Sequence, residues 1–458
     1  QFHNSKEKLN SIGVIANNDF DTYATIVACL LSGITYVPVE PTHPDERNNH
    51  VVELSSLNMI CSSNLKSVSQ NFYTHHRDKF FKLSKNTDKV GPASINPTEN
   101  PAYILFTSGT TGRPKGVPIT RENLMAFVYN INKTGIVNSK EDRFLQIFDL
   151  TFDASVFSYL IPLLNGACIF TLKKTSMKYI EAIELISKHA ITHVFTVPSF
   201  LSYVEPYFKE ISLLTIRYWL FCGEALQTKY LHSWQVCLPN AKIFNHYGPT
   251  EATVFCTSYD CSSGFIKDDH GIICIGKPFE GTTFELFDNA EHITENFETG
   301  ELCISSVQLT KGYINNKKEN QQKFFKYNGS IYYRTGDLCF RDTAGDYFFK
   351  GRSDAQIKIN GYRVELREIE NAALTIAGLK EAVALAVDTL KITRIVLFVV
   401  GQTRYSENDF RSLLGEKLPE YMIPMKVIFI SNMPYSLNGK IDKKSLLNYY
   451  KHEISNSV

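Results

Sequence analysis

The chain has 458 residues, of which 43% are hydrophobic and 21% charged, and 48 basic residues balance 47 acidic ones to a formal charge of +1. This length exceeds what one hydrophobic core usually serves, so at least two domains are expected. Because the net charge is close to zero, it gives no reason to expect nucleic acid or an anionic membrane as the main partner.

The ten cysteines lie between Cys29 and Cys339, with no CxxC pair and no tight Cys/His cluster. This spacing favours reduced thiols in the cytoplasm over a disulfide framework or a structural zinc site. No basic start followed by an apolar run indicates a signal peptide, and no apolar stretch is long enough to cross a bilayer, so we expect no membrane insertion. Gln1 is not an initiator residue, which is consistent with a natural start further upstream.

Apolar runs alternate with amphipathic stretches from the start of the chain. Strands are predicted at residues 12–16, 36–39, 104–106, 167–172 and 192–197. Helices are predicted at residues 21–31, 177–189 and 200–208, and from Thr120 onward. This alternation predicts α/β layers with mostly parallel strands.

After about Tyr332 the predicted segments become shorter and surround glycine turns. Strands are predicted at residues 347–350, 356–359, 382–388 and 392–400, and helices at residues 366–377 and 407–417. We interpret this part as a smaller α+β domain. The predicted fold class is therefore α/β, with a large N-terminal domain of layered α/β subdomains at residues 1–353 and a small C-terminal domain at residues 354–458.

The segment from Thr107 to Gly116 reads TSGTTGRPKG and follows a β-prone apolar run. Its three glycines let backbone N–H groups approach an anion, its four hydroxyls add donors or metal contacts, and Lys115 adds positive charge. A flexible surface turn is the alternative, but so many phosphate-binding groups together favour a phosphate loop. The loop is not a Walker motif, because Gly116 and Val117 follow the lysine, and the dinucleotide fingerprint GxGxxG is absent.

This loop resembles the signature loop of the adenylate-forming superfamily, which includes acyl-CoA synthetases, luciferases and the adenylation domains of nonribosomal peptide synthetases. Further motifs follow in the family's order, namely Phe152-Asp-Ala-Ser155, Asn245-His-Tyr-Gly-Pro-Thr-Glu251, Gly300-Glu-Leu-Cys-Ile304, Tyr333-Arg-Thr-Gly-Asp-Leu338, Gly351-Arg-Ser-Asp354, Gln356-Ile-Lys-Ile-Asn-Gly361, Leu418-Pro-Glu-Tyr-Met-Ile-Pro424 and Asn438-Gly-Lys-Ile-Asp442. The resemblance covers nearly the whole chain, although the family's first motif is not visible. Ser306, Lys311 and Arg367 depart from the usual glycine, arginine and glycine, and none of them is chemically indispensable.

The resemblance implies that ATP and Mg²⁺ activate a carboxylic acid, whose carboxylate attacks the α-phosphate and expels pyrophosphate. Glu251 and Thr107 would hold Mg²⁺, Tyr247 would stack on adenine, Asp337 would accept hydrogen bonds from the ribose hydroxyls, and Arg352 would lie near ribose and phosphate. The implied nucleotide contacts are Thr107, Ser108, Gly109, Thr110, Thr111, Gly112, Lys115, Gly223, Glu224, Ala225, Asn245, Tyr247, Gly248, Thr250, Asp337, Arg352 and Lys440. Taken alone, Glu251 could instead cap a helix and Asp337 could be a turn residue.

The resemblance names Lys440, Glu251, Thr107 and Lys115 as the catalytic residues. Lys440 lies in a turn close to the last residue and would normally be solvated, but the family assigns this lysine to the attacking carboxylate and the α-phosphate. Such a role implies that the small domain is mobile. Asp354 matches the family's hinge, about which the small domain swings to bring a thiol to the adenylate.

Asp153 indicates which acid is activated. In amino-acid-activating members of the family an aspartate at this position pairs with the substrate's α-ammonium group, and acyl-CoA synthetases lack it; a helix N-cap is the alternative role. The rest of the implied substrate pocket is Ala154, Phe157, Phe200, Leu220, Cys222, His246, Val254 and Phe255. Three phenylalanines leave little volume for a side chain, so we expect glycine ahead of D- or L-alanine.

The chain ends about 18 residues after Lys440, so the expected acceptor is the phosphopantetheine thiol of a separate carrier protein. The segments around Cys222 and Glu251 resemble those of free-standing D-alanine–carrier-protein ligases, which implies a role in cell-envelope or lipid A modification or in nonribosomal synthesis. Two alternatives stay open: an acyl- or aryl-CoA ligase in which Asp153 is incidental, and an inactive nucleotide-binding scaffold.

Overall fold

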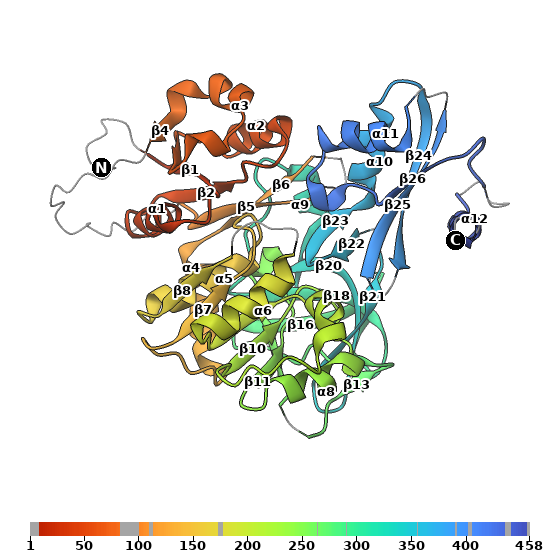
Figure 1. Ribbon diagram of the computed structural model, residues 1–458. Coiled ribbons are helices and arrows are strands. Elements are labelled where there is room, and N and C mark those ends of the chain that lie inside the picture. The colour runs from red at the N-terminus through yellow and green to blue at the C-terminus, as the bar shows by residue number, and fades with distance from the viewer. Residues whose placement is uncertain are drawn as a thin grey trace. The chain divides into compact units, whose positions relative to one another are not determined.

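The computed structural model describes residues 9–82, 100–109, 113–172, 177–262, 264–289, 291–354, 356–389, 392–401, 405–435 and 441–455 (Figure 1). Contacts divide the chain into two compact units. The first comprises residues 1–41, 49–107 and 115–354, and the second comprises residues 42–48, 108–114 and 355–458. The predicted α/β fold with a large N-terminal part and a smaller C-terminal part is confirmed.

The first unit begins with a six-stranded sheet in the order β4-β3-β1-β2-β5-β6. Its strands are β1 (Ser11–Ile15), β2 (Thr35–Val39), β3 (Met59–Ser62), β4 (Phe80–Lys82), β5 (Tyr103–Thr107) and β6 (Lys115–Ile119). All neighbours are parallel except β5 and β6, which form an antiparallel pair. Every residue of β1 and β2 is buried, as expected for strands covered on both faces.

Three helices accompany this sheet along the chain: α1 (Phe20–Leu31), α2 (Asp45–Leu54) and α3 (Gln70–His75). α1 begins where it does because the Asp19 carboxylate accepts a hydrogen bond from the Thr22 backbone N–H (2.9 Å), which satisfies one otherwise unpaired donor of the first turn. Tyr23, Ile26 and Cys29 on one side of α1 join the core with Ile12 and Val14 of β1.

A second sheet has seven strands in the order β15-β12-β11-β10-β9-β7-β8. They are β7 (Arg143–Gln146), β8 (Cys168–Thr171), β9 (His193–Thr196), β10 (Tyr218–Phe221), β11 (Lys242–Asn245), β12 (Thr257–Asp260) and β15 (Lys277–Pro278). α4 (Arg121–Lys133) precedes β7, and the helices between the strands are α5 (Ala154–Leu164), α6 (Lys178–His189), α7 (Ser199–Val204) and α8 (Thr228–Cys237). Strands β7 to β11 are parallel, so their carboxyl ends share one edge.

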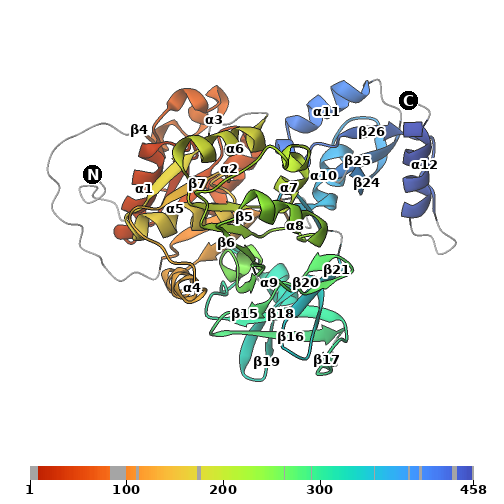
Figure 2. The same ribbon diagram turned by 60° about the horizontal axis from the view of Figure 1, so that its bottom comes forward.

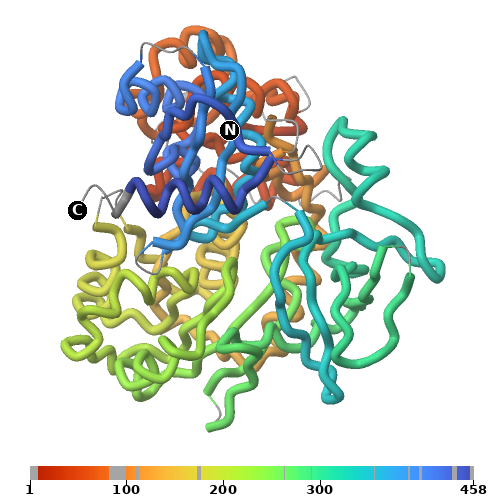
Figure 3. The backbone as a smooth tube through the Cα atoms, turned by 90° about the vertical axis from the view of Figure 1, so that its right-hand side faces the viewer, coloured from red at the N-terminus to blue at the C-terminus, as the bar shows by residue number. Residues whose placement is uncertain are grey.

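A third, wholly antiparallel sheet completes the first unit, at the bottom of Figure 2 and in green to cyan in Figure 3. It contains β16 (Thr282–Asp288), β17 (Glu291–Ile293), β18 (Gly300–Ser306), β19 (Phe324–Tyr327), β20 (Ser330–Arg341) and β21 (Tyr347–Arg352), together with α9 (Lys317–Lys323) between β18 and β19. A short hairpin, β13 (Asp268–Asp269) and β14 (Ile272–Ile273), precedes it. The antiparallel region therefore starts about fifty residues before the change of pattern expected near Tyr332.

The second unit contains a hairpin, β22 (Gln356–Ile359) and β23 (Tyr362–Glu365), and a three-stranded sheet of β24 (Leu379–Thr389), β25 (Ile392–Gly401) and β26 (Lys426–Phe429). Its helices are α10 (Leu366–Leu374), α11 (Glu407–Gly415) and α12 (Lys443–Ser455). Leu397 and Val399 pack with α10 and α11, whereas Val396 and Phe398 pack with α12. β25 thus buries alternate side chains on both faces, which explains its almost continuous apolar sequence.

Most predicted segments match an observed element within a few residues, but the phosphate loop differs. Lys115 and Gly116 are not loop residues: they begin β6, where Lys115 pairs across from Thr107 of β5. The buried side chains of Val117 and Ile119 hold this strand in the sheet. Within the described ranges no helix combines the length and the apolar character needed to cross a bilayer.

The central place of β25 gives a stability prediction. Leu397 is fully buried, so Leu397→Ala should lower the free energy of unfolding of the second unit by about 2–5 kcal/mol. Leu374→Ala, at a position that is 43% exposed on α10, should lower it by less than about 1 kcal/mol. Urea unfolding with hydrogen exchange of the β25 amides would measure both, and an equal effect of the two substitutions would contradict the assignment of this core.

Candidate active site

The carboxyl edge of the parallel strands in the second sheet gathers several of the predicted substrate residues. Phe221 lies in register with Thr196 of β9 and Asn245 of β11, so Cys222 and His246 follow their strands side by side. Asp153 follows β7, the neighbour of β9, after a loop of six residues. Open parallel sheets bind ligands at this edge, because the loops that leave the strands converge there.

Asp153 is 6% exposed and directly precedes α5. The N-cap alternative lacks its main support, because the Asp153 carboxylate makes no cap hydrogen bond to the first turn of α5. Burial, and secondly the charge of Asp153, raise the pKa of the Tyr103 phenol well above its ordinary value, so the two groups are near each other.

The three phenylalanines predicted to crowd the pocket fall into two groups. The Phe157 and Phe255 rings lie 5.9 Å apart, and Phe195 contacts both of them. Phe200 instead packs against Trp219 at 5.3 Å and against Trp234 at 5.9 Å. Phe157, Phe255, Phe200 and Leu220 all belong to the same buried core cluster, and their place in the pocket stays a prediction.

His246 is held in one orientation. Its ring stacks on Phe255 with the centroids 4.2 Å apart, and its Nδ1 lies 2.9 Å from the Thr257 carbonyl oxygen, so Nδ1 carries the proton. Burial lowers the pKa of His246 to about 4, and the imidazole is neutral at pH 7. Nε2 is then a buried acceptor that faces no hydrogen-bond donor among the described residues.

The chain between Glu251 and Phe255 is strained. Thr253 and Val254 both adopt positive φ angles, 59° and 68°, which branched side chains rarely tolerate. The buried amide of Gln308 offsets this strain, because its Nε2 donates to the carbonyl oxygens of Ala252 (3.1 Å) and Phe255 (3.0 Å). Thr253 Oγ1 donates in return to the Gln308 carbonyl oxygen (2.6 Å), so Val254 and Phe255 are fixed beside the predicted pocket.

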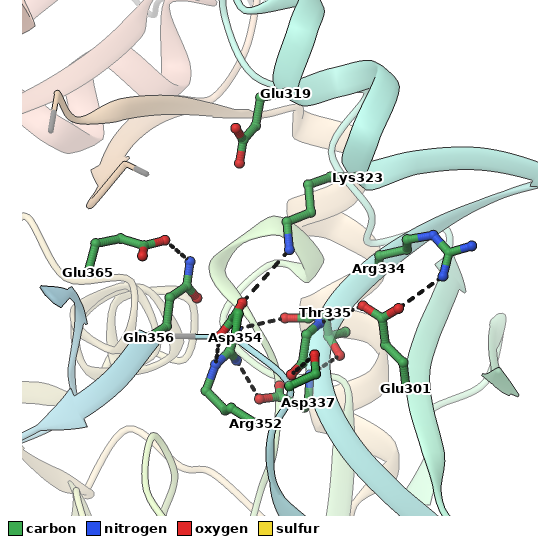
Figure 4. Close-up of polar contacts among 12 residues, drawn as sticks. Glu301, Glu319, Lys323, Arg334, Thr335, Asp337, Arg352, Asp354, Gln356 and Glu365 are labelled. Carbon is green, nitrogen blue, oxygen red and sulfur yellow. Dashed lines mark hydrogen bonds and ion pairs between the residues drawn. The ribbon is translucent and has the colours of Figure 1, made fainter. Parts of the chain in front are cut away.

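Asp337, Arg352 and Asp354 form one charged cluster on the hairpin of β20 and β21 (Figure 4). Arg352 Nη1 donates a hydrogen bond to Asp337 Oδ1. Its Nε and Nη2 donate to the two carboxylate oxygens of Asp354, each at 2.7 Å. Tyr247 donates its hydroxyl to Asp337 Oδ2 (2.6 Å). The residue predicted to hold ribose and the predicted hinge residue are thus bridged by one guanidinium group.

Gly336 is required beside this cluster. Its φ is +76°, and a Cβ there would lie 2.6 Å from Arg352 Nη2 and 2.6 Å from Asp354 Oδ2. Any side chain would therefore displace the ion pair. Lys323 of α9 lies 4.0 Å from Asp354 and adds a second cation to that carboxylate.

The predicted metal and phosphate residues are only partly described. Glu251 lies in a short 3₁₀ turn (Thr250–Ala252), is fully buried, and accepts a hydrogen bond from the Tyr313 hydroxyl (2.6 Å). Thr107 ends β5, and its buried Oγ1 has no hydrogen-bond partner among the described residues. Ser108 donates to the Arg363 carbonyl oxygen (2.8 Å), both residues being in the second unit. Thr110, Thr111, Gly112 and Lys440 lie outside the described residues.

Lys115 does not present a free ammonium group. Its Nζ lies 2.8 Å from Glu319 Oε1 and 4.6 Å from the centre of the Tyr313 ring, and both charged side chains are more than nine-tenths buried. The structure thus gives Lys115 a protein partner, which the sequence did not indicate.

Two sets of predicted nucleotide contacts lie at neighbouring strands: Asn245 ends β11, and Gly223-Glu224-Ala225 follow β10. Asn245 Nδ2 donates to the Cys274 carbonyl oxygen (2.9 Å), which leaves its buried Oδ1 as an acceptor with no donor in the described part of the chain. Glu224 Oε2 accepts a hydrogen bond from the Ser199 backbone N–H (2.8 Å) and so caps α7. Gly248 is part of the turn that leads from Tyr247 to Glu251.

These groups fit a magnesium–nucleotide ligand. The Asn245 Oδ1 acceptor suits an exocyclic amine such as that of adenine, and the Thr107 hydroxyl suits a metal or a phosphate oxygen. Mg²⁺ is usually bound by one or two carboxylates together with phosphate oxygens, and the buried Glu251 suits that role.

Three contributing residues were missed by the sequence analysis: Gln308, Tyr313 and Glu319. Each acts through a contact with a residue at least 53 positions away. A buried Tyr or Gln leaves no signal of its own in composition or periodicity, so only the neighbourhood of Gly300-Glu-Leu-Cys-Ile304 could have pointed to this region.

The profile of a family described as AMP-binding enzyme matches residues 5–314, and that of the AMP-binding enzyme C-terminal domain matches residues 368–440. The D-alanine–D-alanyl carrier protein ligase of Bacillus licheniformis is 30% identical over 439 residues, which cover 92% of this chain and 86% of that protein. Bacitracin synthase 3 of the same species is 29% identical over 444 residues, which cover 95% of this chain. The chain spans only 7% of that synthase, and likewise 7% of tyrocidine synthase 3 of Brevibacillus parabrevis.

Among solved structures, the fold is similar to that of the Vibrio cholerae adenylation domain AlmE in complex with glycyl-adenosine-5'-phosphate. The TM-score is 0.83 at 25% identity, and the match covers 97% of this chain and 89% of that chain.

The neutral state of His246 predicts how stability depends on pH. Its pKa is about 4 in the folded chain against about 6.5 when unfolded, so the unfolded state binds a proton first as the pH falls. Protonation of His246 in the unfolded state therefore lowers the free energy of unfolding as the pH falls from 6.5 towards 4. The free energy of unfolding should be about 2 kcal/mol lower at pH 5 than at pH 7 for this reason. His246→Gln should reduce the difference in unfolding free energy between these two pH values, measured in urea, whereas His232→Gln at an exposed position should not. An unchanged difference in His246→Gln would contradict a neutral buried imidazole.

Proposed function

Because this chain belongs to the AMP-binding enzyme family, we propose that it activates a small α-amino acid with ATP and transfers it to the phosphopantetheine thiol of a carrier protein. The predicted membership of the adenylate-forming superfamily is confirmed by the family match. Activity, substrate and acceptor remain proposals for this chain, which spans a small part of the two synthases named above.

The observation that carries the proposal is the buried carboxylate of Asp153 at the carboxyl edge of the parallel strands. The α-ammonium group of an amino acid is a cation of suitable size and charge to pair with this carboxylate. The absence of a cap hydrogen bond to α5 favours this role over the structural one. Relatives whose names include carrier-protein ligation support the same class of substrate and acceptor.

In the first step, an oxygen of the amino-acid carboxylate would form a bond to the α-phosphorus, and the bond from that phosphorus to the bridging oxygen of pyrophosphate would break. Mg²⁺ held by Glu251 and Thr107 would neutralise charge on the phosphates. Asp337 and Arg352 would orient the ribose, Asn245 would accept a hydrogen bond from adenine, and Lys440 would stabilise the attacking carboxylate and the α-phosphate.

In the second step, a phosphopantetheine thiolate would attack the activated carbonyl carbon and release AMP. The small domain would have to turn about Asp354 between the two steps, so that Lys440 leaves and the thiol arrives. We propose a cytoplasmic location. The carrier protein that bears the amino acid as a thioester would then supply it for envelope or lipid A modification or for nonribosomal synthesis.

Among small amino acids we propose glycine first and D- or L-alanine next. Phe157 and Phe255, both predicted pocket residues, contact each other, which supports a small substrate side chain. The glycyl-adenylate bound to the Vibrio cholerae domain and the D-alanine ligase of Bacillus licheniformis fit the same size range. One methyl group changes binding by only about 1–3 kcal/mol, so the order among these three must be measured.

The proposal is tested by ATP–pyrophosphate exchange with glycine, D-alanine, L-alanine, acetate and benzoate. We expect exchange with a small amino acid and none above background with acetate or benzoate. Exchange with acetate or benzoate but with no amino acid would overturn the proposal in favour of an acyl- or aryl-CoA ligase. ATP binding without exchange for any acid would instead indicate an inactive nucleotide-binding protein.

The hinge role of Asp354 predicts a selective effect of proline. Asp354→Pro fixes φ near −65° and should leave pyrophosphate exchange within about threefold of the unsubstituted protein, while thioester formation on a carrier falls by at least about tenfold. Asp354→Ala removes the ion pair with Arg352 but keeps the backbone free, so it is the matched control. Equal loss of both half-reactions in Asp354→Pro, or equal behaviour of the two variants, would refute a backbone hinge at this position.

A further inference from the structure

Glu251 is approached by a chain of two phenol groups. Tyr313 donates its only hydroxyl proton to Glu251 Oε1 at 2.6 Å, and the Tyr333 hydroxyl lies 3.2 Å from that of Tyr313. Because the Tyr313 proton is committed to the carboxylate, Tyr333 is the donor in the second contact. All three side chains are at most 3% exposed, so water does not compete for these hydrogen bonds.

The backbone of Tyr313 is fixed by one side chain of α9. Asn320 Oδ1 accepts a hydrogen bond from the Tyr313 N–H (2.7 Å), and Asn320 Nδ2 donates to the Tyr313 carbonyl oxygen (2.9 Å). This pair of hydrogen bonds requires glycine at position 312, where φ is +132° and a Cβ would lie 2.9 Å from Asn320 Oδ1. Asn320 thus holds both polar backbone atoms of Tyr313, the N–H and the carbonyl oxygen, and so fixes the position from which the Tyr313 side chain contacts Glu251.

The ring of Tyr313 also faces a cation. Lys115 Nζ lies 4.6 Å from the ring centre and 2.8 Å from Glu319 Oε1. A buried ammonium group at a ring face attracts electron density and makes the phenol a stronger donor. Glu319 neutralises Lys115, so the pair can be buried without a net charge beside the predicted phosphate loop.

We propose that Tyr313 is a positioning residue that orients the Glu251 carboxylate for the magnesium–nucleotide complex, and that Lys115 and Glu319 act through Tyr313. This inference rests on the proposed function, because it assumes that Glu251 binds the metal. A carboxylate has about four acceptor sites, so it can accept the Tyr313 hydrogen bond and still coordinate a metal. Partners that hydrogen-bond to a metal ligand typically change metal affinity by about 10–100-fold.

The assignment also changes the expected role of Lys115. In this arrangement Lys115 does not contact phosphate: it supports the residue that orients the metal ligand. The phosphate end of the site is then built from β6 and from a distant segment that comprises the turn after Gly312 and α9, and these meet at the Tyr313 ring.

The test compares Tyr313→Phe with Tyr347→Phe. Both remove one hydroxyl from a buried tyrosine, but the Tyr347 hydroxyl donates to the Phe284 carbonyl oxygen and takes no part in the Glu251 network. Binding of Mn²⁺ in the presence of α,β-methylene-ATP, followed by electron paramagnetic resonance, reports metal affinity without turnover. We expect the dissociation constant for Mn²⁺ to rise at least about tenfold in Tyr313→Phe and to stay within about twofold in Tyr347→Phe. Tyr333→Phe, which removes only the second donor, should fall between them.

Pyrophosphate exchange as a function of Mg²⁺ concentration gives a second measurement. In Tyr313→Phe the Mg²⁺ concentration for half-maximal exchange should rise at least about tenfold, and high Mg²⁺ should restore most of the rate. Unchanged Mn²⁺ affinity in Tyr313→Phe, or a rate lowered by the same factor at every Mg²⁺ concentration, would overturn the inference while leaving the proposed function intact. Absence of exchange and of nucleotide-dependent Mn²⁺ binding in the unsubstituted protein would overturn both.

Discussion

The buried ion pair between Lys115 and Glu319 is the contact on which the phosphate end of the candidate site depends. It joins the first residue of β6 to the first turn of α9, and the two residues are 204 positions apart in the sequence. Removing one partner of a buried pair leaves an uncompensated charge and commonly costs about 3–5 kcal/mol. The cation also lies at the Tyr313 ring, and the Tyr313 hydroxyl donates to Glu251, so the ion pair and the Glu251 carboxylate are positioned together. The pairing of the buried charges and the orientation of Glu251 therefore depend on the same set of contacts.

A second charge cluster, around Arg352, is only partly buried and is built differently. Its carboxylates, Asp337 and Asp354, come from within the same hairpin or directly after it, so their geometry follows from the cross-strand register of Asp337 with Arg352. Local pairing of this kind needs few distant contacts, whereas the Glu251 network needs segments from three parts of the chain. The charged hairpin belongs to the antiparallel sheet, whereas the parallel strands of the first unit align Cys222 and His246 at one edge.

Much of this organisation could be predicted from the sequence, and the exceptions have physical causes. The buried strands at residues 36–39 and 192–197 were found because continuous apolar runs between turn residues are typical of parallel sheets. The ordered motifs identified Asp153, Glu251 and Asp337 in the sequence, but a motif does not show which side chains contact these residues in the fold. The contacts of Phe200 with Trp219 and Trp234 therefore could not be predicted, since they depend on tertiary packing. Lys115 was assigned to a loop because five residues that include a proline give too weak a signal for a strand, and its antiparallel pairing with β5 is a long-range property.

The distribution of the cysteines has a practical consequence. Nine of the ten are buried, and Cys168, at the start of the edge strand β8, is exposed. Burial raises the pKa of Cys61 and Cys303 to about 12, so these thiols are poor nucleophiles at neutral pH. A maleimide dye should consequently label the folded protein at a single position without any substitution. Residues 355–458 contain no cysteine, so one engineered thiol there would carry the second dye of a fluorescence pair that reports the distance between the two units.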